Sequence, residues 1–307
     1  MESIRKHPVR GIIILLIATV IWGLAYIAQS DAMQYMGPIA FNCIRITLGG
    51  LVLIPFVPIF HHFDPHYRAL AASDRRAKWK VSLIGGVVCG VCLCLAAAFQ
   101  QIGISTTSAG KSGFLTALYI VLVPIFGLFF KRRASWIVLF GVAIALIGSY
   151  FLCVKNPELF VIEQGDWMLI LDAVMFAFQI LFIDFFLSRG GDSILMTCIE
   201  FLFAGIIQIP FMLIFEPTSM SAVIQAIPAI LYAGLASGAV GYTLQMLGQK
   251  ELEPTGASLL MSLESVFAAL FGWIILGERM TGRELFGCGL VFLAVIVSQL
   301  PIRKRKR

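Results

Sequence analysis

Long, uninterrupted runs of apolar residues recur along the whole chain. Ten of these runs reach the length, about 18 residues or more, that a helix needs to cross the hydrocarbon core of a bilayer. The runs are continuous and do not alternate between apolar and polar positions, which excludes a transmembrane β-barrel. We therefore predict an all-α integral membrane protein with ten transmembrane helices, near residues 11–29, 38–60, 81–101, 110–130, 135–153, 165–187, 193–215, 226–247, 254–276 and 284–301.

The overall composition leads to the same conclusion. Hydrophobic residues make up 59% of the 307 residues and charged residues only 13%, with a mean hydropathy of +0.93. Soluble domains carry about 25% charged residues, so this chain cannot cover itself with a water-facing surface. The net charge of +6 comes from short basic runs between apolar blocks and at the C-terminus, a distribution that orients membrane proteins and gives no reason to expect a nucleic-acid partner.

Basic residues are distributed unequally between alternate loops. They are concentrated before the first span, in the segments 68–80 and 131–133, and in the tail Arg303–Arg307. The loops on the other side contain only Lys111, Lys155, Arg279 and Arg283. Because positive loops stay on the cytoplasmic side, we predict a multi-pass protein of the cell membrane with both termini in the cytoplasm, as an even number of spans requires.

The two halves of the chain repeat each other. The second span, Asn42–Phe56, and the seventh, Thr197–Phe211, match without a gap at six positions of this stretch, and Gln100 and Gly103 correspond to Gln245 and Gly248. Each half contains five spans, an odd number, so the copies enter the membrane from opposite sides. We predict two inverted repeats, residues 1–155 and residues 156–307 with the basic cytoplasmic tail, an arrangement that provides a route to alternating access.

Several short motifs carry a resemblance to a known family. In the first half they are Ile21-Trp22-Gly23, Phe41-Asn42-x-x-Arg45, Phe99-Gln100-Gln101-Ile102-Gly103, Lys111-Ser112-Gly113-Phe114, and Leu118-Tyr119 with Pro124. In the second half they are Tyr242-Thr243-Leu244-Gln245, Ser262-Leu263-Glu264-Ser265 and Leu276-Gly277-Glu278-Arg279. With these motifs the sequence resembles the EamA-type ten-helix branch of the drug/metabolite transporter superfamily over nearly its whole length.

The resemblance implies a secondary transporter, an exporter by analogy, that moves a small organic metabolite such as an amino acid or a related solute. The family's members differ in cargo, so the substrate stays open. One departure is visible: the fourth span ends in Lys131-Arg132-Arg133, where the family usually has a Gly-Glu pair like Gly277-Glu278. A carboxylate is therefore not expected to act at that position.

Carboxylates within apolar spans are the first candidates for function, because a buried charge needs a partner, a water-filled cavity or a role. Glu264 lies halfway along the ninth span and Asp172 lies in the sixth, on one helical face with Phe176 and Gln179. Both are candidates for binding a substrate cation or a coupling proton. The alternative is a structural carboxylate that joins neighbouring helices. Asp184, near the predicted cytoplasmic end, is expected to be a solvated helix cap.

Cationic side chains form a second group of candidates. Arg45, with Asn42 on the same face, fits bidentate binding of an anionic group, although a structural latch fits as well. Glu200 is the repeat counterpart of Arg45, which suggests an ion pair between the repeats. Inversion places the two toward opposite membrane faces, however, so a direct contact stays open. Lys111 opens the fourth span, where its charge opposes the helix dipole. This position suggests a carboxylate partner or an anionic ligand; the alternative is a side chain that extends to the outer interface.

Aromatic and amide side chains line up on two further faces and complete a candidate substrate pocket. Thr19, Trp22, Tyr26 and Gln29 align on the first span, and Tyr242, Gln245 and Gln249 align on the eighth. The predicted substrate-binding residues are Trp22, Tyr26, Asn42, Arg45, Gln100, Lys111, Tyr119, Gln179, Tyr242, Gln245 and Glu264; Glu264 and Asp172 are the proton-coupling candidates.

Neither a metal nor a cofactor is expected. His61, His62, Asp64 and His66 are residue types that bind zinc, but we expect them in a loop away from the transport path. The cysteines Cys89, Cys92 and Cys94 lie in a glycine-rich span, where they act as small packing residues. A Walker-type phosphate loop does not occur in the sequence, so energy must come from a gradient or from exchange.

Two other functional classes stay open at this stage. A membrane enzyme that modifies lipid would need a cluster of catalytic groups, which only the 61–66 segment approaches. A channel would need repeated polar rings along a pore, which the sparse, single polar residues of the spans do not supply. A subunit without transport of its own would need no such pathway. The sequence also leaves open the direction of transport, proton coupling and assembly into a homodimer.

Overall fold

A computed structural model describes residues 7–106, 109–154, 163–277 and 279–298, and helices are the only regular secondary structure within these ranges. The first half contains α1 (Pro8–Ala32), α2 (Pro38–Phe63), α3 (Pro65–Ala69), α4 (Ala72–Thr106), α5 (Ala109–Thr116), α6 (Tyr119–Gly127) and α7 (Trp136–Cys153). The second half contains α8 (Gln164–Leu187), α9 (Ser193–Phe215), α10 (Met220–Gln225), α11 (Ile227–Leu231), the π-helix η2 (Tyr232–Gly241), α12 (Tyr242–Gln249), α13 (Pro254–Met261), α14 (Leu263–Leu276) and α15 (Gly282–Ser298).

The helices have the lengths of membrane spans. Eight helical stretches of the described chain are long and apolar enough to cross a bilayer. The other two predicted spans correspond to the shorter apolar stretch Ser112–Gly127 and to α15, which is described to Ser298. The expected all-helical membrane fold is therefore confirmed, and each predicted span coincides with a helical segment.

Three of the spans are not regular α-helices throughout, which the sequence analysis did not anticipate. The fourth is interrupted between α5 and α6, the eighth contains the π-helix η2, and the ninth bends at Ser262 between α13 and α14. At the last of these breaks the hydroxyl of Ser262 donates to the carbonyl of Leu259, and the hydroxyl of Ser265 donates to that of Ser262. Serine hydroxyls that bond back to the preceding turn compete with the helical ladder and bend it.

Equivalent helices of the two halves pack on each other. The second helices of the halves, α2 and α9, pack on each other, as do the fifth, α7 and α15. The Sγ of Cys43 lies 3.9 Å from the carbonyl oxygen of Gly205, and the Sγ of Cys198 lies 3.8 Å from that of Gly50. These four residues are repeat counterparts, so the contacts have the reciprocity that a pseudo-twofold axis requires.

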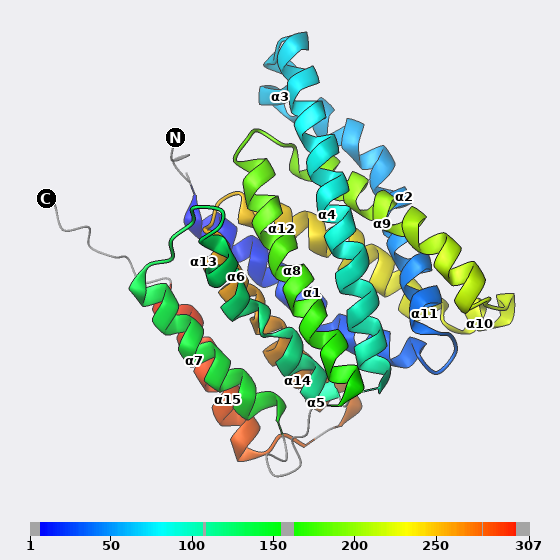
Figure 1. The fold of residues 1–307 in the computed structure, drawn as a ribbon, viewed down its shortest axis with the longest axis vertical. Coiled ribbons are helices and arrows are strands. Elements are labelled where there is room, and N and C mark those ends of the chain that lie inside the picture. Colours follow the sequence, from blue (N-terminus) through cyan, green and yellow to red (C-terminus); the bar gives the residue numbers. More distant parts are fainter. Residues whose placement is uncertain (1–6, 107–108, 155–162, 278, 299–307) are drawn as a thin grey trace, which may run out of the picture.

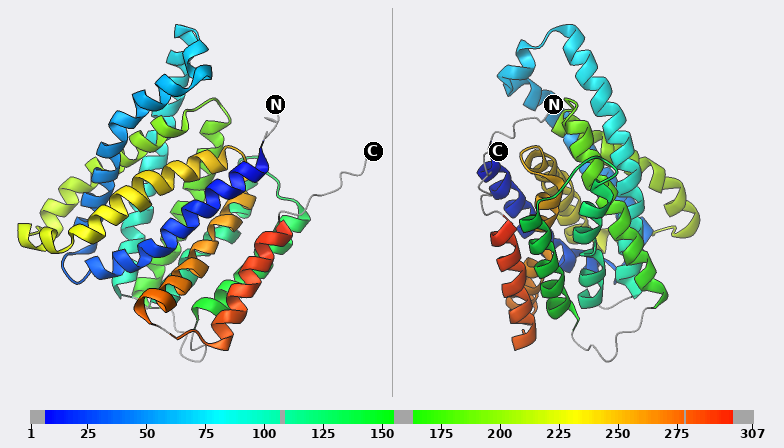
Figure 2. Two further views of the ribbon diagram at one scale, coloured as in Figure 1. Left: turned by 180° about the vertical axis from the view of Figure 1, so that it is seen from behind. Right: turned by 60° about the vertical axis from the view of Figure 1, so that its left-hand side comes forward.

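The helix ends define two sides of the bundle. Helix α1 begins and α15 ends on the same side, where α3 and the connection between α8 and α9 also lie (Figures 1 and 2). We call this the N-side. Helices α2 and α8 begin on the opposite side, so α2 and α9 run in opposite directions (Figure 1).

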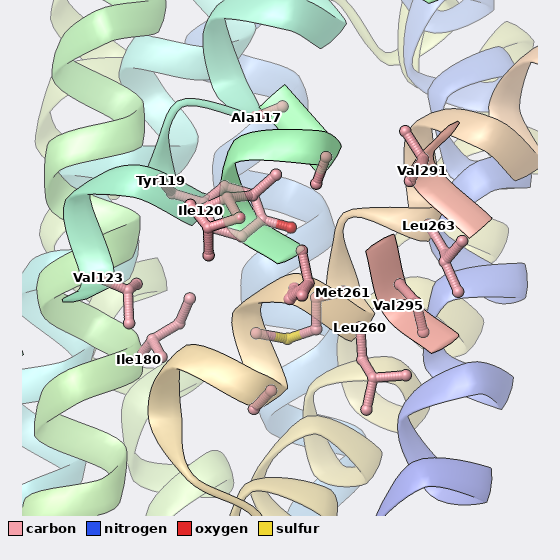
Figure 3. Packing of buried hydrophobic residues seen from close by; sticks show 14 of the residues in the cluster. Ala117, Tyr119, Ile120, Val123, Ile180, Leu260, Met261, Leu263, Val291 and Val295 are labelled. Atoms are coloured by element: carbon pink, nitrogen blue, oxygen red, sulfur yellow. The ribbon is translucent and has the colours of Figure 1, made fainter. Parts of the chain in front are cut away.

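The main hydrophobic core joins both halves. Tyr119, Ile120 and Val123 of the fourth span pack with Ile180 of α8 and with residues of α13 and α15 (Figure 3). Large apolar side chains such as those of Phe215, Ile206 and Leu51 are exposed on the outer surface of the bundle, where an acyl-chain environment replaces water.

Candidate functional site

A cavity lies between the two halves, near the middle of the bundle. Its volume is about 40 Å³, room for roughly three water molecules, so an organic solute requires the surrounding helices to move apart. The lining comes from both halves and includes one guanidinium and two carboxyl groups. The lining residues are Trp22, Ala25, Tyr26, Gln29, Arg45, Ala96, Ala97, Gln100, Thr116, Asp172, Phe176, Ser237, Tyr242 and Glu264.

Asp172 presents a partly satisfied carboxylate to this cavity. Its Oδ2 accepts a 2.9 Å hydrogen bond from the hydroxyl of Thr116 and a 3.4 Å bond from Nε2 of Gln100. The residue is only 1% exposed, so removal from bulk water is nearly complete. A buried carboxyl group with unused acceptor capacity is suited to bind a cationic group or a proton.

Glu264 reaches the cavity from the second half of the broken ninth span. It stands directly after the bend at Ser262, in the first turn of α14. Within the described chain, no ion pair engages its carboxyl group, and it interacts electrostatically with Tyr119 and Asp172. Tyr119 itself is buried edge-to-face against Phe176 and does not line the cavity. The bend in the helix thus brings the carboxyl group of Glu264 to the cavity wall.

Arg45 contributes the positive charge. Its Nε donates a 2.6 Å hydrogen bond to Oδ1 of Asn42, whose Nδ2 in turn donates to the backbone carbonyl of Ala97. Within the described residues, no carboxylate lies within ion-pair distance of the guanidinium. Asn42 does not line the cavity; it holds Nε of Arg45 in place. The terminal nitrogens of Arg45 thus stay available for an anionic group.

Two aromatic rings, those of Trp22 and Tyr242, also line the cavity. The indole nitrogen of Trp22 donates a 3.1 Å bond to the backbone carbonyl of Ser237 in η2. The ring of Trp22 also meets Tyr242 edge-on, with centroids 5.2 Å apart. A Cβ at Gly241 would lie 2.6 Å from Trp22 Nε1, so glycine is required where η2 passes the indole.

The predicted amide residues separate into two groups. Gln100 lines the cavity, whereas Gln179 and Gln245 form a network behind it. Nε2 of Gln245 donates to Oε1 of Gln179 over 3.0 Å, and Nε2 of Gln179 donates to Oε1 of Glu200 over 2.7 Å. The sequence analysis placed Gln179 and Gln245 in the substrate pocket; in this conformation they instead connect α8, α9 and α12.

The side chain of Lys111 lies outside the described residues, so its predicted role stays a prediction. The sequence analysis missed two polar lining residues, Thr116 and Ser237, and three alanines, Ala25, Ala96 and Ala97. The signal at Thr116 was weak because a threonine in an apolar span is commonly bonded to its own helix. The backbone carbonyl of Ser237 accepts the bond from Trp22, and a pattern of side chains does not indicate a backbone contact of this kind.

The expectation that Asp184 is a solvated helix cap was wrong. Asp184 is 6% exposed and forms an ion pair with the partly exposed Arg132 from the turn after α6, so it is a buried, paired carboxylate and not a solvated cap. The first repeat's departure from the family motif, Lys131-Arg132-Arg133, thus supplies the partner.

The 61–66 segment is not the loop that the sequence analysis expected. His61 and His62 belong to the last turn of α2, and Asp64 caps α3. His61 stacks on Tyr67 and contacts Asp192 at 3.3 Å. No group of three potential metal ligands occurs among the described residues.

Comparison with known proteins gives a consistent match. The model of the EamA-like transporter family matches residues 9–154 and again residues 163–299. An uncharacterized transporter of Archaeoglobus fulgidus is 28% identical over 94% of this chain and 85% of its own length. The threonine/homoserine exporter RhtA of Escherichia coli K12 is 28% identical over 99% of this chain and 97% of its own length.

A solved structure shares the fold. One crystal structure of a protein superposes with a TM-score of 0.74 at 18% identity and covers 94% of this chain and 96% of that one. At this level of identity the likeness concerns the arrangement of the helices alone.

Proposed function

Because this chain belongs to the EamA-like transporter family, we propose that it is a secondary active transporter that exports a small organic metabolite across the cell membrane by alternating access. The chain is a multi-pass membrane transporter and not an enzyme, as its family shows. An amino acid or a related solute is the substrate class that we propose. The similarity to a threonine/homoserine exporter over nearly the whole length of both chains supports this class.

One observation carries the proposal: a cavity between two inverted halves contains a guanidinium and two carboxyl groups within a bundle of apolar spans. Separated charges of both signs suit a solute with an ammonium and a carboxylate group. Arg45 would hold the carboxylate, while Asp172 and Glu264 would face the ammonium. Trp22 and Tyr242 would cover the apolar part of the solute.

Proton coupling is the finer part of the proposal. Asp172 and Glu264 line the same small cavity and interact electrostatically. Two like charges this close, away from bulk water, repel each other, so the pair favours binding of a proton or of a cationic solute group. Competition between the proton and the ammonium group for these two carboxyl groups would couple solute export to proton entry.

The test is flux into proteoliposomes that contain the purified protein. A panel of amino acids and their amine and carboxylic acid analogues is offered under an imposed pH gradient, with threonine and homoserine first. We expect accumulation of at least one amino acid against its gradient, and collapse of the accumulation when a protonophore is added. If no member of the panel moves faster than in empty liposomes, the proposed substrate class is wrong.

A further inference from the structure

Arg45 and Glu200 hold equivalent positions in the two halves but very different environments. Each lies two helical turns after the first residue of its helix, Pro38 of α2 and Ser193 of α9, roughly 10 Å into the bundle. Helix α2, which carries Arg45, begins on the side opposite the N-side, and Arg45 lines the cavity. Helix α9, which carries Glu200, begins on the N-side; Glu200 does not reach the cavity and is 0% exposed.

The equivalence holds in three dimensions as well as in sequence. The reciprocal contacts of Cys43 with Gly205 and of Cys198 with Gly50 place α2 and α9 symmetrically about one axis. Both side chains are buried, but only Arg45 lines the cavity, and this difference is a departure from symmetry. Alternating access in an inverted repeat requires such a departure, because each half adopts one of two arrangements.

Glu200 is incompletely satisfied where it lies. Its Oε1 accepts the bond from Gln179, but its Oε2 is buried without a hydrogen-bond partner among the described residues. The Oε1 of Gln245, at the far end of the same network, is also buried and unpaired. A buried polar atom without a partner is unfavourable, and exposure of Glu200 to water or to a ligand would supply the missing partner.

An apolar cluster, which we call the plug, includes Met196, one helical turn nearer than Glu200 to the N-side end of α9. It consists of buried residues from α4, α8, α9 and α12, namely Cys89, Ile183, Leu187, Met196 and Met246. The buried apolar cluster at the opposite side is formed by α1, α2, α11 and η2, and it contains no residue of α4. By the repeat spacing, the counterpart of Met246 on α4 is the polar residue Gln101. The plug on the N-side therefore includes a helix, α12, whose counterpart α4 takes no part in the cluster at the opposite side.

We propose that Glu200 is a cavity residue of the opposite conformation, in which it takes the place that Arg45 holds here. The inference rests on the proposed alternating access. When the halves exchange arrangements, the plug opens, Glu200 faces the cavity from the N-side, and Arg45 is sealed. The cavity then presents a carboxyl group toward the N-side and a guanidinium toward the opposite side. A solute with an ammonium group therefore binds more tightly from the N-side. From the opposite side, the positive charge of Arg45 weakens its binding.

The experiment measures from which side each position can be reached. Arg45→Cys and Glu200→Cys are made singly in a variant whose natural cysteines are replaced by alanine. Each protein, in oriented proteoliposomes with solute turning over, is treated on one side or the other with a charged, membrane-impermeant methanethiosulfonate reagent. Leu51→Cys and Ile206→Cys are a matched control pair, because these repeat counterparts are 53% and 62% exposed on the lipid-facing surface and should not react.

We expect Glu200→Cys to react only from the N-side and Arg45→Cys only from the opposite side. The inference is overturned if Glu200→Cys stays unreactive while Arg45→Cys reacts, or if both react from the same side, even though the solute is transported. Absence of transport in the unaltered protein would instead contradict the proposed function. The two failures are thereby distinguishable.

A second measurement needs no cysteine-free variant. Glu200→Gln keeps the shape of the side chain and removes the charge, in an otherwise unaltered protein. The apparent Kd for the transported solute should rise at least tenfold from the N-side and change less than twofold from the opposite side. An equal change on both sides, or no change on either, would contradict the exchange of Arg45 and Glu200 at the cavity.

Discussion

The hydroxyl of Thr116 donates a 2.9 Å hydrogen bond to Oδ2 of Asp172. Thr116 is the last residue of α5, where the fourth span breaks, and Asp172 lies on the continuous helix α8 of the other half. The bond thus joins a discontinuous helix to a continuous one at the cavity wall. Irregular backbone at membrane depth is tolerated where it lines a cavity, and here the end of the half-helix α5 is tied to Asp172 by this bond.

Replacement of Asp172 by asparagine should uncouple transport from the proton gradient. Asparagine keeps the size of the side chain and the bond from Thr116 but cannot take up and release a proton. We expect gradient-driven accumulation in proteoliposomes to fall at least tenfold, while exchange of internal for external solute continues. Asp31→Asn, at an exposed position near the end of α1, serves as the control. Undiminished accumulation by Asp172→Asn would exclude Asp172 as a coupling residue.

Replacement of Arg45 by glutamine should weaken binding of the solute's anionic group. Hydrogen bonds to charged groups contribute about 1.5–3 kcal/mol, which corresponds to a rise in Kd of roughly 10- to 150-fold. Lysine should restore only part of the affinity, because it lacks the planar fork that holds a carboxylate with two bonds. Calorimetric titration measures the effect, and Arg75→Gln at an exposed site is the control. Equal affinities of the Arg45→Gln and unaltered proteins would contradict this role.

Close helix packing between α7 and α15 should depend on one of two neighbouring glycines. A Cβ at Gly287 would lie 2.4 Å from the backbone nitrogen of Leu152, whereas Gly289 has nothing within 4 Å. Overpacking costs typically 1–3 kcal/mol, so Gly287→Ala should lower the thermal unfolding midpoint in detergent by several degrees. Gly289→Ala, on the same helix, should leave it unchanged. Equal midpoints for the two variants would show that α7 and α15 do not approach this closely.

The pair of Asp184 and Arg132 should stabilise the fold without a role in transport. Asp184→Asn and Arg132→Gln are each expected to lower stability, and a double-mutant cycle should give a coupling of about 0.5–3 kcal/mol. The lower half of that range is expected, because 34% of the Arg132 side chain is exposed and screened by solvent. Transport per folded molecule should stay within twofold of the unaltered protein. A coupling of zero would show that the two residues do not interact.

Much of the fold was predictable because the pattern of apolar runs is a direct consequence of the lipid environment. Spans such as Pro38–Phe63 and Ser193–Phe215 are continuous, and their apolar residues mark them completely. The breaks after Thr116 and at Ser262 were not predictable. They depend on local backbone geometry, and at Ser262 also on serine hydroxyls that bond to the preceding turn. Ser258 makes the same kind of bond within α13 without interrupting it, so the residue type alone does not mark a break.

The candidate site was predictable in its residue types but less so in their grouping. Asp172, Glu264 and Arg45 attract attention because charge in an apolar span is costly, and the structure brings all three to one cavity. Gln179 and Gln245 carried the same kind of signal, yet they pair with each other and with Glu200. Which polar residues face a cavity and which pair behind it depends on helix rotation, and a single sequence does not record that rotation.

Solute counterflow tests the central claim, that one cavity is exposed alternately to the two sides, most directly. Proteoliposomes are loaded with unlabelled solute, the solute that the flux panel identifies, and are diluted into a trace of labelled solute with no pH gradient and no membrane potential. A carrier with one alternating site predicts a transient overshoot of labelled solute inside, and Arg45→Gln should reduce it. Labelled solute that rises to equilibrium without an overshoot, despite the preload, would contradict alternating access through this cavity.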